Sequence, residues 1–148
     1  MTAKRKKYNN MLILLVVGLG FLLLATGRLS QHHNSLPLLP AEAKLQSLVF
    51  AALVLEFDDG VWRSNPSLSD AKQQSLLQAW RNAQMVPIEV PSPKPVAPVL
   101  VDVYLQDGTY PQTALLYPHL AAIKIHGQPQ WWRLVNQEMA TLLPQGEQ

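Results

Sequence analysis

The 148-residue chain contains no cysteine. This absence excludes disulfides, thiolate metal sites, a cysteine nucleophile and a lipidated cysteine. A folded domain in this chain must therefore take its stability from an apolar core, and about 100 residues are enough to build one. The length gives room for about one domain.

Charged side chains are also scarce, at 15% of the residues, and they are unevenly distributed. Four of the twelve basic residues are Lys4, Arg5, Lys6 and Lys7. From Ser30 onward there are seven basic and ten acidic residues, which gives a net charge of −3 (7 − 10). A mildly acidic domain has no electrostatic footprint for nucleic acid, so we exclude nucleic acid as a partner.

Recognisable catalytic and metal-binding motifs are missing as well. The chain has no nucleophile elbow, no phosphate-binding glycine-rich loop and no paired-histidine zinc motif. The adjacent His32 and His33 have no further ligands at helical or hairpin spacing, so we interpret them as part of a solvated linker. Glu56, Asp58 and Asp59 lack the spacing of a calcium loop. The sequence therefore predicts no catalytic residue, no metal and no cofactor, and it leaves enzymatic activity open.

A long apolar run lies near the N-terminus. Residues 11–27, MLILLVVGLGFLLLATG, are 17 residues without a charge, and 11 of them are Leu, Ile, Val or Phe. As a helix, residues 8–29 would rise roughly 33 Å, close to the thickness of a hydrocarbon core of about 30 Å. We therefore predict a transmembrane helix over residues 11–28. Its predicted membrane-anchor residues are Met11, Leu15, Leu19, Phe21 and Leu24.

Flanking charge predicts the orientation of this helix. The basic residues 4–7 precede the run, whereas only Arg28 follows it closely. By the positive-inside rule, the N-terminus lies in the cytoplasm and the domain that follows lies in the periplasm or outside the cell, anchored in the cytoplasmic membrane by a single pass. The alternative is a cleaved signal peptide, because Ala25-Thr26-Gly27 offers small residues at a cleavage site.

The predicted fold class is α+β. We expect the N-terminal transmembrane helix to be followed by one antiparallel sheet of five or six strands, with two helices on one face. The predicted organisation is a cytoplasmic basic tail, the transmembrane helix, a linker, an extracytoplasmic domain and a C-terminal tail, over residues 1–10, 11–28, 29–44, 45–143 and 144–148 respectively.

Two hairpins are predicted from alternation and turn residues. A strand from about Val49 to Phe57 is followed by Asp59-Gly60, which suits a tight type I′ turn, and by a returning strand over residues 61–64. The second hairpin joins residues 99–105, which alternate apolar and other side chains, to residues 112–117.

The remaining elements are a helix, an extended stretch, two strands and a closing helix. Ser69 or Asp70 begins a predicted helix over residues 70–84, whose apolar stripe includes Trp80 as a core residue. Residues 87–98 carry five prolines, so we expect an extended segment rather than a central strand. Strands follow over 121–126 and 130–134, and Asn136 caps a short helix that ends before Pro144.

Four aromatic residues form the predicted binding site. On a strand, Trp131 and Trp132 point to opposite faces, so one should enter the core while the other faces outward or lies under a loop. Trp62 and Tyr110 each lie just past a hairpin turn and could join it in an exposed aromatic patch. Such a patch would suit a protein partner, a glycan or the membrane interface.

The order of these elements resembles a known family. Gly60-Val61-Trp62 on the second strand of a hairpin, then Asn65-Pro66, then the helical Leu76-Leu77-Gln78-Ala79-Trp80 are similar to an uncharacterised bacterial membrane-anchored domain family associated with gliding-motility-type ABC transporters. The resemblance implies an α+β accessory domain and transfers no catalytic residues.

The functional hypothesis that fits these features is a non-enzymatic binding or scaffold module of an envelope complex. Its expected partners are the lipid bilayer and another envelope protein. The alternatives are an envelope enzyme or small-ligand-binding protein with a pocket near the aromatic residues, and a secreted soluble protein released by cleavage of the signal.

Overall fold

The computed structural model describes residues 13–22 and 34–144 of the chain. The chain divides into two compact units, Met1–Asn34 and Ser35–Gln148. Lys4, Arg5, Lys6 and Lys7, and the anchor residues Met11 and Leu24, lie outside the described residues.

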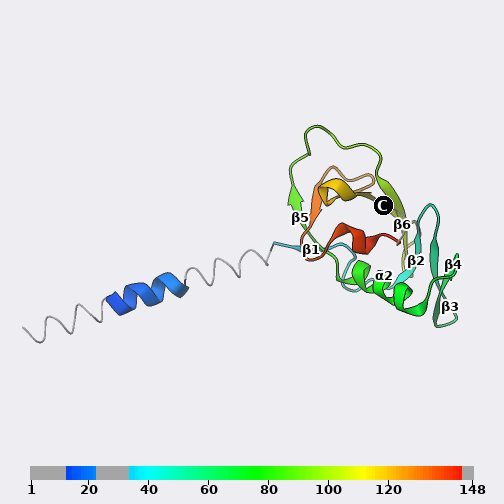
Figure 1. The fold of residues 1–148 in the computed structure, drawn as a ribbon, viewed down its shortest axis with the longest axis horizontal. Helices are drawn as coiled ribbons and strands as arrows, with labels where there is room; N and C mark the ends of the chain where they lie inside the picture. Colours follow the sequence, from blue (N-terminus) through cyan, green and yellow to red (C-terminus); the bar gives the residue numbers. More distant parts are fainter. Residues whose placement is uncertain (1–12, 23–33, 145–148) are drawn as a thin grey trace, which may run out of the picture. The chain divides into compact units, whose positions relative to one another are not determined.

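Within the first unit, residues 13–22 form a helix, drawn in blue in Figure 1. In the described ranges 13–22 and 34–144, no helix is long and apolar enough to cross a membrane. The prediction of a transmembrane helix over residues 11–28 is therefore contradicted; of that range the structure describes residues 13–22, which are helical.

The second unit is built on one sheet of nine strands, so the prediction of five or six strands is wrong. The strand order is β1-β5-β9-β8-β7-β6-β2-β3-β4, and every neighbouring pair is antiparallel. The strands are β1 (Leu36–Pro37), β2 (Leu45–Val49), β3 (Val54–Asp58), β4 (Val61–Asn65), β5 (Gln84–Ile88), β6 (Val99–Leu105), β7 (Gln112–Tyr117), β8 (Ala122–Ile125) and β9 (Trp131–Leu134).

Part of the difference in strand number comes from the apolar run over residues 45–57. It forms two strands, β2 and β3, rather than one, because the chain turns back after Phe50. The Phe50 N–H donates to the Leu53 carbonyl oxygen at 2.8 Å, and Leu48 then lies opposite Leu55 in the sheet. Both leucines are fully buried, so the turn places two apolar side chains of the run in the core.

The predicted turn of the first hairpin and the second hairpin are confirmed, but the first strand of the first hairpin begins at Val54 rather than at about Val49. Asp59 and Gly60 join β3 to β4 with φ angles of 50° and 80°, as a type I′ turn requires. The strands β6 and β7 cover residues 99–105 and 112–117 and pair with each other.

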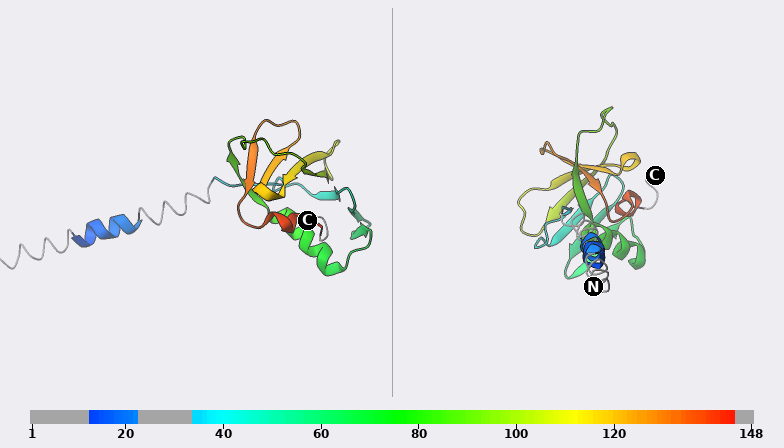
Figure 2. Two further views of the ribbon diagram at one scale, coloured as in Figure 1. Left: turned by 45° about the horizontal axis from the view of Figure 1, so that its top comes forward. Right: turned by 90° about the vertical axis from the view of Figure 1, so that its left-hand side faces the viewer.

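The helix α2 (Asp70–Asn82) connects β4, at one edge of the sheet, to β5 near the other edge. The Ser69 side chain accepts a hydrogen bond from the Lys72 N–H, which confirms the predicted start. The helix ends before the predicted residue 84 because Gln84 already belongs to β5. Figures 1 and 2 show the sheet curving around α2, so the helix covers the concave face.

The main core lies between this concave face and α2. Trp80 of α2 is fully buried, as predicted, and its ring meets the Phe50 ring edge-on at a centroid distance of 6.2 Å. The Trp80 Nε1–H donates to the Leu142 carbonyl oxygen at 2.9 Å. This bond ties α2 to the C-terminal 3-10 helix η2 (Met139–Leu142), drawn in red.

Asn136 does not cap the closing helix, and this prediction is corrected. The N-cap of η2 is Glu138, whereas the Asn136 side chain accepts from the Gln84 N–H at 2.8 Å and donates to the Asn82 carbonyl oxygen at 2.7 Å. Asn136 thus holds the junction between α2 and β5.

The folded unit begins at Ser35 rather than at residue 45, because part of the segment assigned to the linker is structured. Residues 36–37 form β1, and Leu38 and Leu39 are buried in the main core. The Leu38 N–H donates to the Ala83 carbonyl oxygen at 2.9 Å, which joins this segment to the end of α2.

The strand β5 was not predicted, because Pro87 argues against a central strand. Its pairing with β1 covers only Gln84 and Met85, so beyond Met85 the strand is an edge of the sheet. Proline is tolerated at an edge because its missing N–H is not needed for pairing there. The proline-rich segment that follows leads to β6 (Figure 1).

Candidate binding groove

The structure places the four predicted aromatic residues at different sites. Trp131 is only 2% exposed and belongs to a small second cluster with Tyr117 and Ala122. Lys124 lies opposite it on β8, with Nζ 5.3 Å from the ring centroid. Tyr110, by contrast, is 84% exposed.

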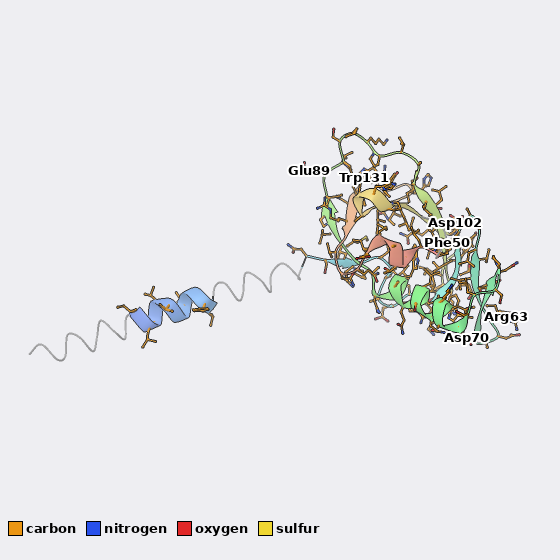
Figure 3. All side chains as sticks on the ribbon, viewed as in Figure 1. Phe50, Arg63, Asp70, Glu89, Asp102 and Trp131 are labelled. Carbon is orange, nitrogen blue, oxygen red and sulfur yellow. The ribbon has the colours of Figure 1, made fainter. Side chains whose placement is uncertain are left out.

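Trp132 is partly buried against the main core, and its buried Nε1 has no hydrogen-bond partner among the residues that the structure describes. It follows Trp131 on β9, and the two rings belong to different clusters, as alternation along a strand requires. In Figure 3, Trp131 lies at one end of the folded unit and Arg63, the β4 neighbour of Trp62, lies at the other. The four aromatics therefore do not gather in one patch.

Trp62 borders an open hollow of about 700 Å³ in the folded unit, which we name the Trp62 groove. Its walls come from the segment between β1 and β2, from the β3–β4 hairpin and from the chain around the end of α2. The lining residues are Pro37, Leu39, Pro40, Ala41, Ala43, Lys44, Leu45, Phe57, Trp62, Arg81, Gln84 and Gln106.

The hairpin fixes the aromatic side of the groove. Phe57 and Trp62 lie opposite each other on β3 and β4, and their ring centroids are 5.5 Å apart. The Gln46 side chain donates to the Phe57 carbonyl oxygen at 2.8 Å. The buried Gln73 of α2 donates its Nε2–H to the Trp62 carbonyl oxygen, also at 2.8 Å. Because β4 is an edge strand, this bond satisfies a backbone group that no neighbouring strand pairs.

The opposite wall is held by backbone hydrogen bonds. The Ala43 N–H donates to the Pro40 carbonyl oxygen at 3.0 Å and closes a turn. The Gln106 N–H donates to the Lys44 carbonyl oxygen at 2.9 Å and joins this turn to the end of β6. Leu45, the first residue of β2, is 5% exposed. The wall is therefore fixed at both ends and apolar at its base.

Arg81, in the last turn of α2, completes the groove. Its guanidinium carbon lies 5.9 Å from the centroid of the Trp62 ring, within the range of a cation–π contact. This contact links the C-terminal end of the helix to the edge strand of the sheet. The cation also suits its position, because basic side chains near a helix C-terminus complement the helix dipole.

The ionisable side chains that line the groove are both basic. They are Lys44 and Arg81, and among the described residues that line it there is no carboxylate and no histidine. Over residues 13–22 and 34–144, no group of three or more His, Cys, Asp or Glu residues could hold a metal ion. The arrangement can hold apolar side chains against the rings and can bind groups that accept hydrogen bonds from cations.

A second hollow lies between α2 and η2, with a volume of about 520 Å³, and we name it the η2 hollow. No aromatic ring lines it, and Lys72 is its one charged lining residue. Its lining residues are Leu68, Ala71, Lys72, Ser75, Leu76, Gln78, Ala79, Asn82, Gln137, Ala140, Thr141, Leu143 and Pro144.

The sequence singled out Trp62 but not its partners in the groove. Phe57 was recognisable as the cross-strand neighbour of Trp62 once the Asp59-Gly60 turn was assigned. No pattern in the sequence indicates that Arg81 and Lys44 line the same groove as Trp62, because tertiary packing brings these residues together.

Comparison with known proteins assigns no family to this chain. No protein-family model matches it, and no curated protein or solved structure is significantly similar to it. The family resemblance based on Gly60-Val61-Trp62 and Asn65-Pro66 therefore stays a prediction.

Proposed function

We propose that this chain is a non-enzymatic binding module that holds an extended segment of a partner protein in the Trp62 groove. The observation that carries the proposal is the fixed Phe57–Trp62 ring pair on the wall of an open hollow of about 700 Å³. Tryptophan and arginine are the residue types that most often dominate the energy of protein interfaces, and this groove has one of each in contact.

The shape of the groove favours a peptide segment as its occupant. Its volume lies within the range of about 300–1,000 Å³ that is typical of ligand sites. The hollow is open rather than enclosed, so a chain can lie along it and continue beyond it. The prolines at 37 and 40 and the strand pairing of Phe57 and Trp62 make its walls stiff, which lowers the entropy lost on binding.

We further propose that the N-terminal apolar segment binds a lipid bilayer. The supporting observation is the helix over residues 13–22, in which every large apolar side chain is more than half exposed. Apolar area of this extent needs a cover, and lipid provides one. The exposed side chains are Ile13 (60%), Leu14 (73%), Leu15 (62%), Val16 (61%), Val17 (51%), Leu19 (59%), Phe21 (70%) and Leu22 (65%).

Site-specific photo-crosslinking in intact cells tests the groove. A benzophenone amino acid replaces Gln106 at the groove or, as the matched control, Gln78 at the η2 hollow. We expect a discrete adduct with a second protein from position 106 and none from position 78. We also expect Trp62→Ala to abolish the adduct. Equal adducts from the two positions, or an adduct that is indifferent to Trp62→Ala, would overturn the proposal.

Flotation with liposomes tests the lipid part separately. The full chain should float with vesicles of phosphatidylethanolamine and phosphatidylglycerol after an alkaline wash, whereas a variant without residues 11–27 should stay at the bottom of the gradient. Recovery of the full chain in the wash would refute bilayer binding and would leave the groove proposal intact.

A further inference from the structure

The charge of the Trp62 groove differs in sign from the charge of the unit that carries it. Residues 35–144 contain seven basic and nine acidic side chains, a net charge of −2 (7 − 9). The groove is lined by two of the seven basic residues, Lys44 and Arg81, and by no acidic residue. A site that is positive on a negative unit attracts negative ligands and repels positive ones.

In the part of the chain that the structure describes, these two cations have no carboxylate within ion-pair distance. Within the described part of the chain the one ion pair is between Arg63 and Asp58, at 3.4 Å, so neither Lys44 nor Arg81 has a carboxylate partner there. Both side chains are exposed. A ligand carboxylate can therefore reach them without displacing an internal acid.

Arg81 lies near the Trp62 ring, with its guanidinium carbon 5.9 Å from the ring centroid. A guanidinium carries five N–H donors in one plane and needs acceptors for them. In the described residues, the Arg81 guanidinium donates no hydrogen bond to the protein. A guanidinium whose donors have no acceptor in the described residues suits a bidentate bond with a ligand carboxylate.

The other lining residues of the groove determine which ligand groups can lie beside the bound carboxylate. Leu39, Leu45 and Phe57 give an apolar base, and the side chains of Gln84 and Gln106 supply neutral amides. An apolar residue of the ligand can be buried against this base while its neighbours reach the two cations.

We infer that the groove selects peptide segments in which Asp or Glu flanks an apolar side chain. Arg81 binds one side-chain carboxylate bidentately, Lys44 attracts a second, and the apolar side chain packs on Phe57 and Trp62. This inference rests on the proposed function and adds the chemistry of its ligand.

The test is selection of displayed random nonapeptides on the full chain, held in nanodiscs of phosphatidylcholine. The peptides are fused at their C-termini, so no free terminal carboxylate can substitute for Asp or Glu. We expect Asp and Glu to be enriched at least about twofold among the bound peptides. Arg81→Gln should weaken a selected peptide about tenfold or more, and Lys44→Gln should weaken it less, because only Arg81 can bind bidentately.

The matched control is Lys72→Gln, which removes an exposed cation at the η2 hollow of the same helix and should leave affinity unchanged. Circular dichroism of each variant establishes that it is folded. Affinity should also fall as salt rises, because exposed charges are screened.

Each of the other possible outcomes overturns either this inference or the proposed function. Peptides that depend on Trp62 but lack acidic residues would overturn this inference and keep the proposed function. Failure to select any peptide whose binding depends on Trp62 would overturn the proposed function itself. Arg81-dependent binding to phosphatidylglycerol nanodiscs, without peptide binding, would assign the cations to a lipid headgroup and reject the inference.

Discussion

The Trp62 groove and the η2 hollow both border α2, yet their walls differ in kind. Among the described residues, the groove is lined by two rings in contact and by two cations without a carboxylate partner, whereas the hollow is lined by no ring and by one cation. Both are of a size that could hold a ligand, at about 700 and 520 Å³. The kinds of side chain that line a hollow, rather than its volume, therefore distinguish a candidate binding site from a gap between packed elements.

The two hollows also differ in how their walls are held. Strand pairing and the bond from Gln73 to Trp62 fix the groove at the edge of the sheet. The η2 hollow is held by the bond from Trp80 to Leu142 and by the Gln137 side chain, which donates to the Ala79 carbonyl oxygen at 2.6 Å. The walls of the groove are thus held at the edge of the sheet, whereas the walls of the hollow are held by hydrogen bonds between α2 and the C-terminal segment.

The strongest effect comes from a core residue of α2, the helix that both sites border. Trp80 is fully buried, so Trp80→Ala should lower the free energy of unfolding by about 3–5 kcal/mol through cavity formation and loss of the bond to Leu142. Urea denaturation of the full chain in detergent, followed by circular dichroism, measures this. The control Gln78→Ala changes an exposed residue of the same helix and should alter stability by less than about 0.5 kcal/mol. Equal stability of the two variants would contradict the assigned core.

The second prediction compares the effects on peptide affinity of replacing Trp62 and Tyr110, which the sequence placed in one aromatic patch. Trp62→Ala should weaken a groove-binding peptide by about 2 kcal/mol or more, roughly 30-fold, because Trp62 forms the wall. Tyr110→Ala should leave affinity unchanged, since Tyr110 is 84% exposed and does not line the groove. Isothermal calorimetry with one selected peptide compares them. A loss caused by Tyr110→Ala would place the ligand at the connection between β6 and β7 instead.

A smaller effect on stability is expected when the hydrogen bond between α2 and the edge strand β4 is removed. Gln73→Leu leaves the Trp62 carbonyl oxygen without its donor, so the free energy of unfolding should fall by about 1–3 kcal/mol. Amide hydrogen exchange should accelerate in β4 more than in β6. The same replacement at the exposed Gln74 is the control. Uniform acceleration over the whole sheet would show that Gln73 supports the fold rather than the groove.

Elements governed by short-range interactions were predictable from the sequence. The Asp59-Gly60 turn needs two residues that accept positive φ, and residues 99–105 alternate by themselves. Ser69 caps α2 through an atom only three residues away. None of these depends on what the rest of the chain does.

Elements that depend on distant partners were missed. Strand β1 exists because it pairs with β5, and β5 tolerates Pro87 because the sheet ends there. The residues of the Trp62 groove were missed for the same reason, because they come from distant parts of the chain. Trp62 was identified as an aromatic after a turn, but Arg81 reaches it only because α2 crosses the concave face. Lys44 lines the same groove because it directly precedes β2, which pairs with β3.

The chain's own tryptophans report most directly on whether the Trp62 groove is the binding site. The chain has four, and each indole N–H gives its own signal in a nitrogen–proton NMR spectrum. When a selected peptide is added to the full chain in nanodiscs, we predict that the Trp62 signal shifts, while the signals of Trp80 and Trp131, at 0% and 2% exposure, stay in place. A shift of Trp131 with Trp62 unmoved would contradict the account.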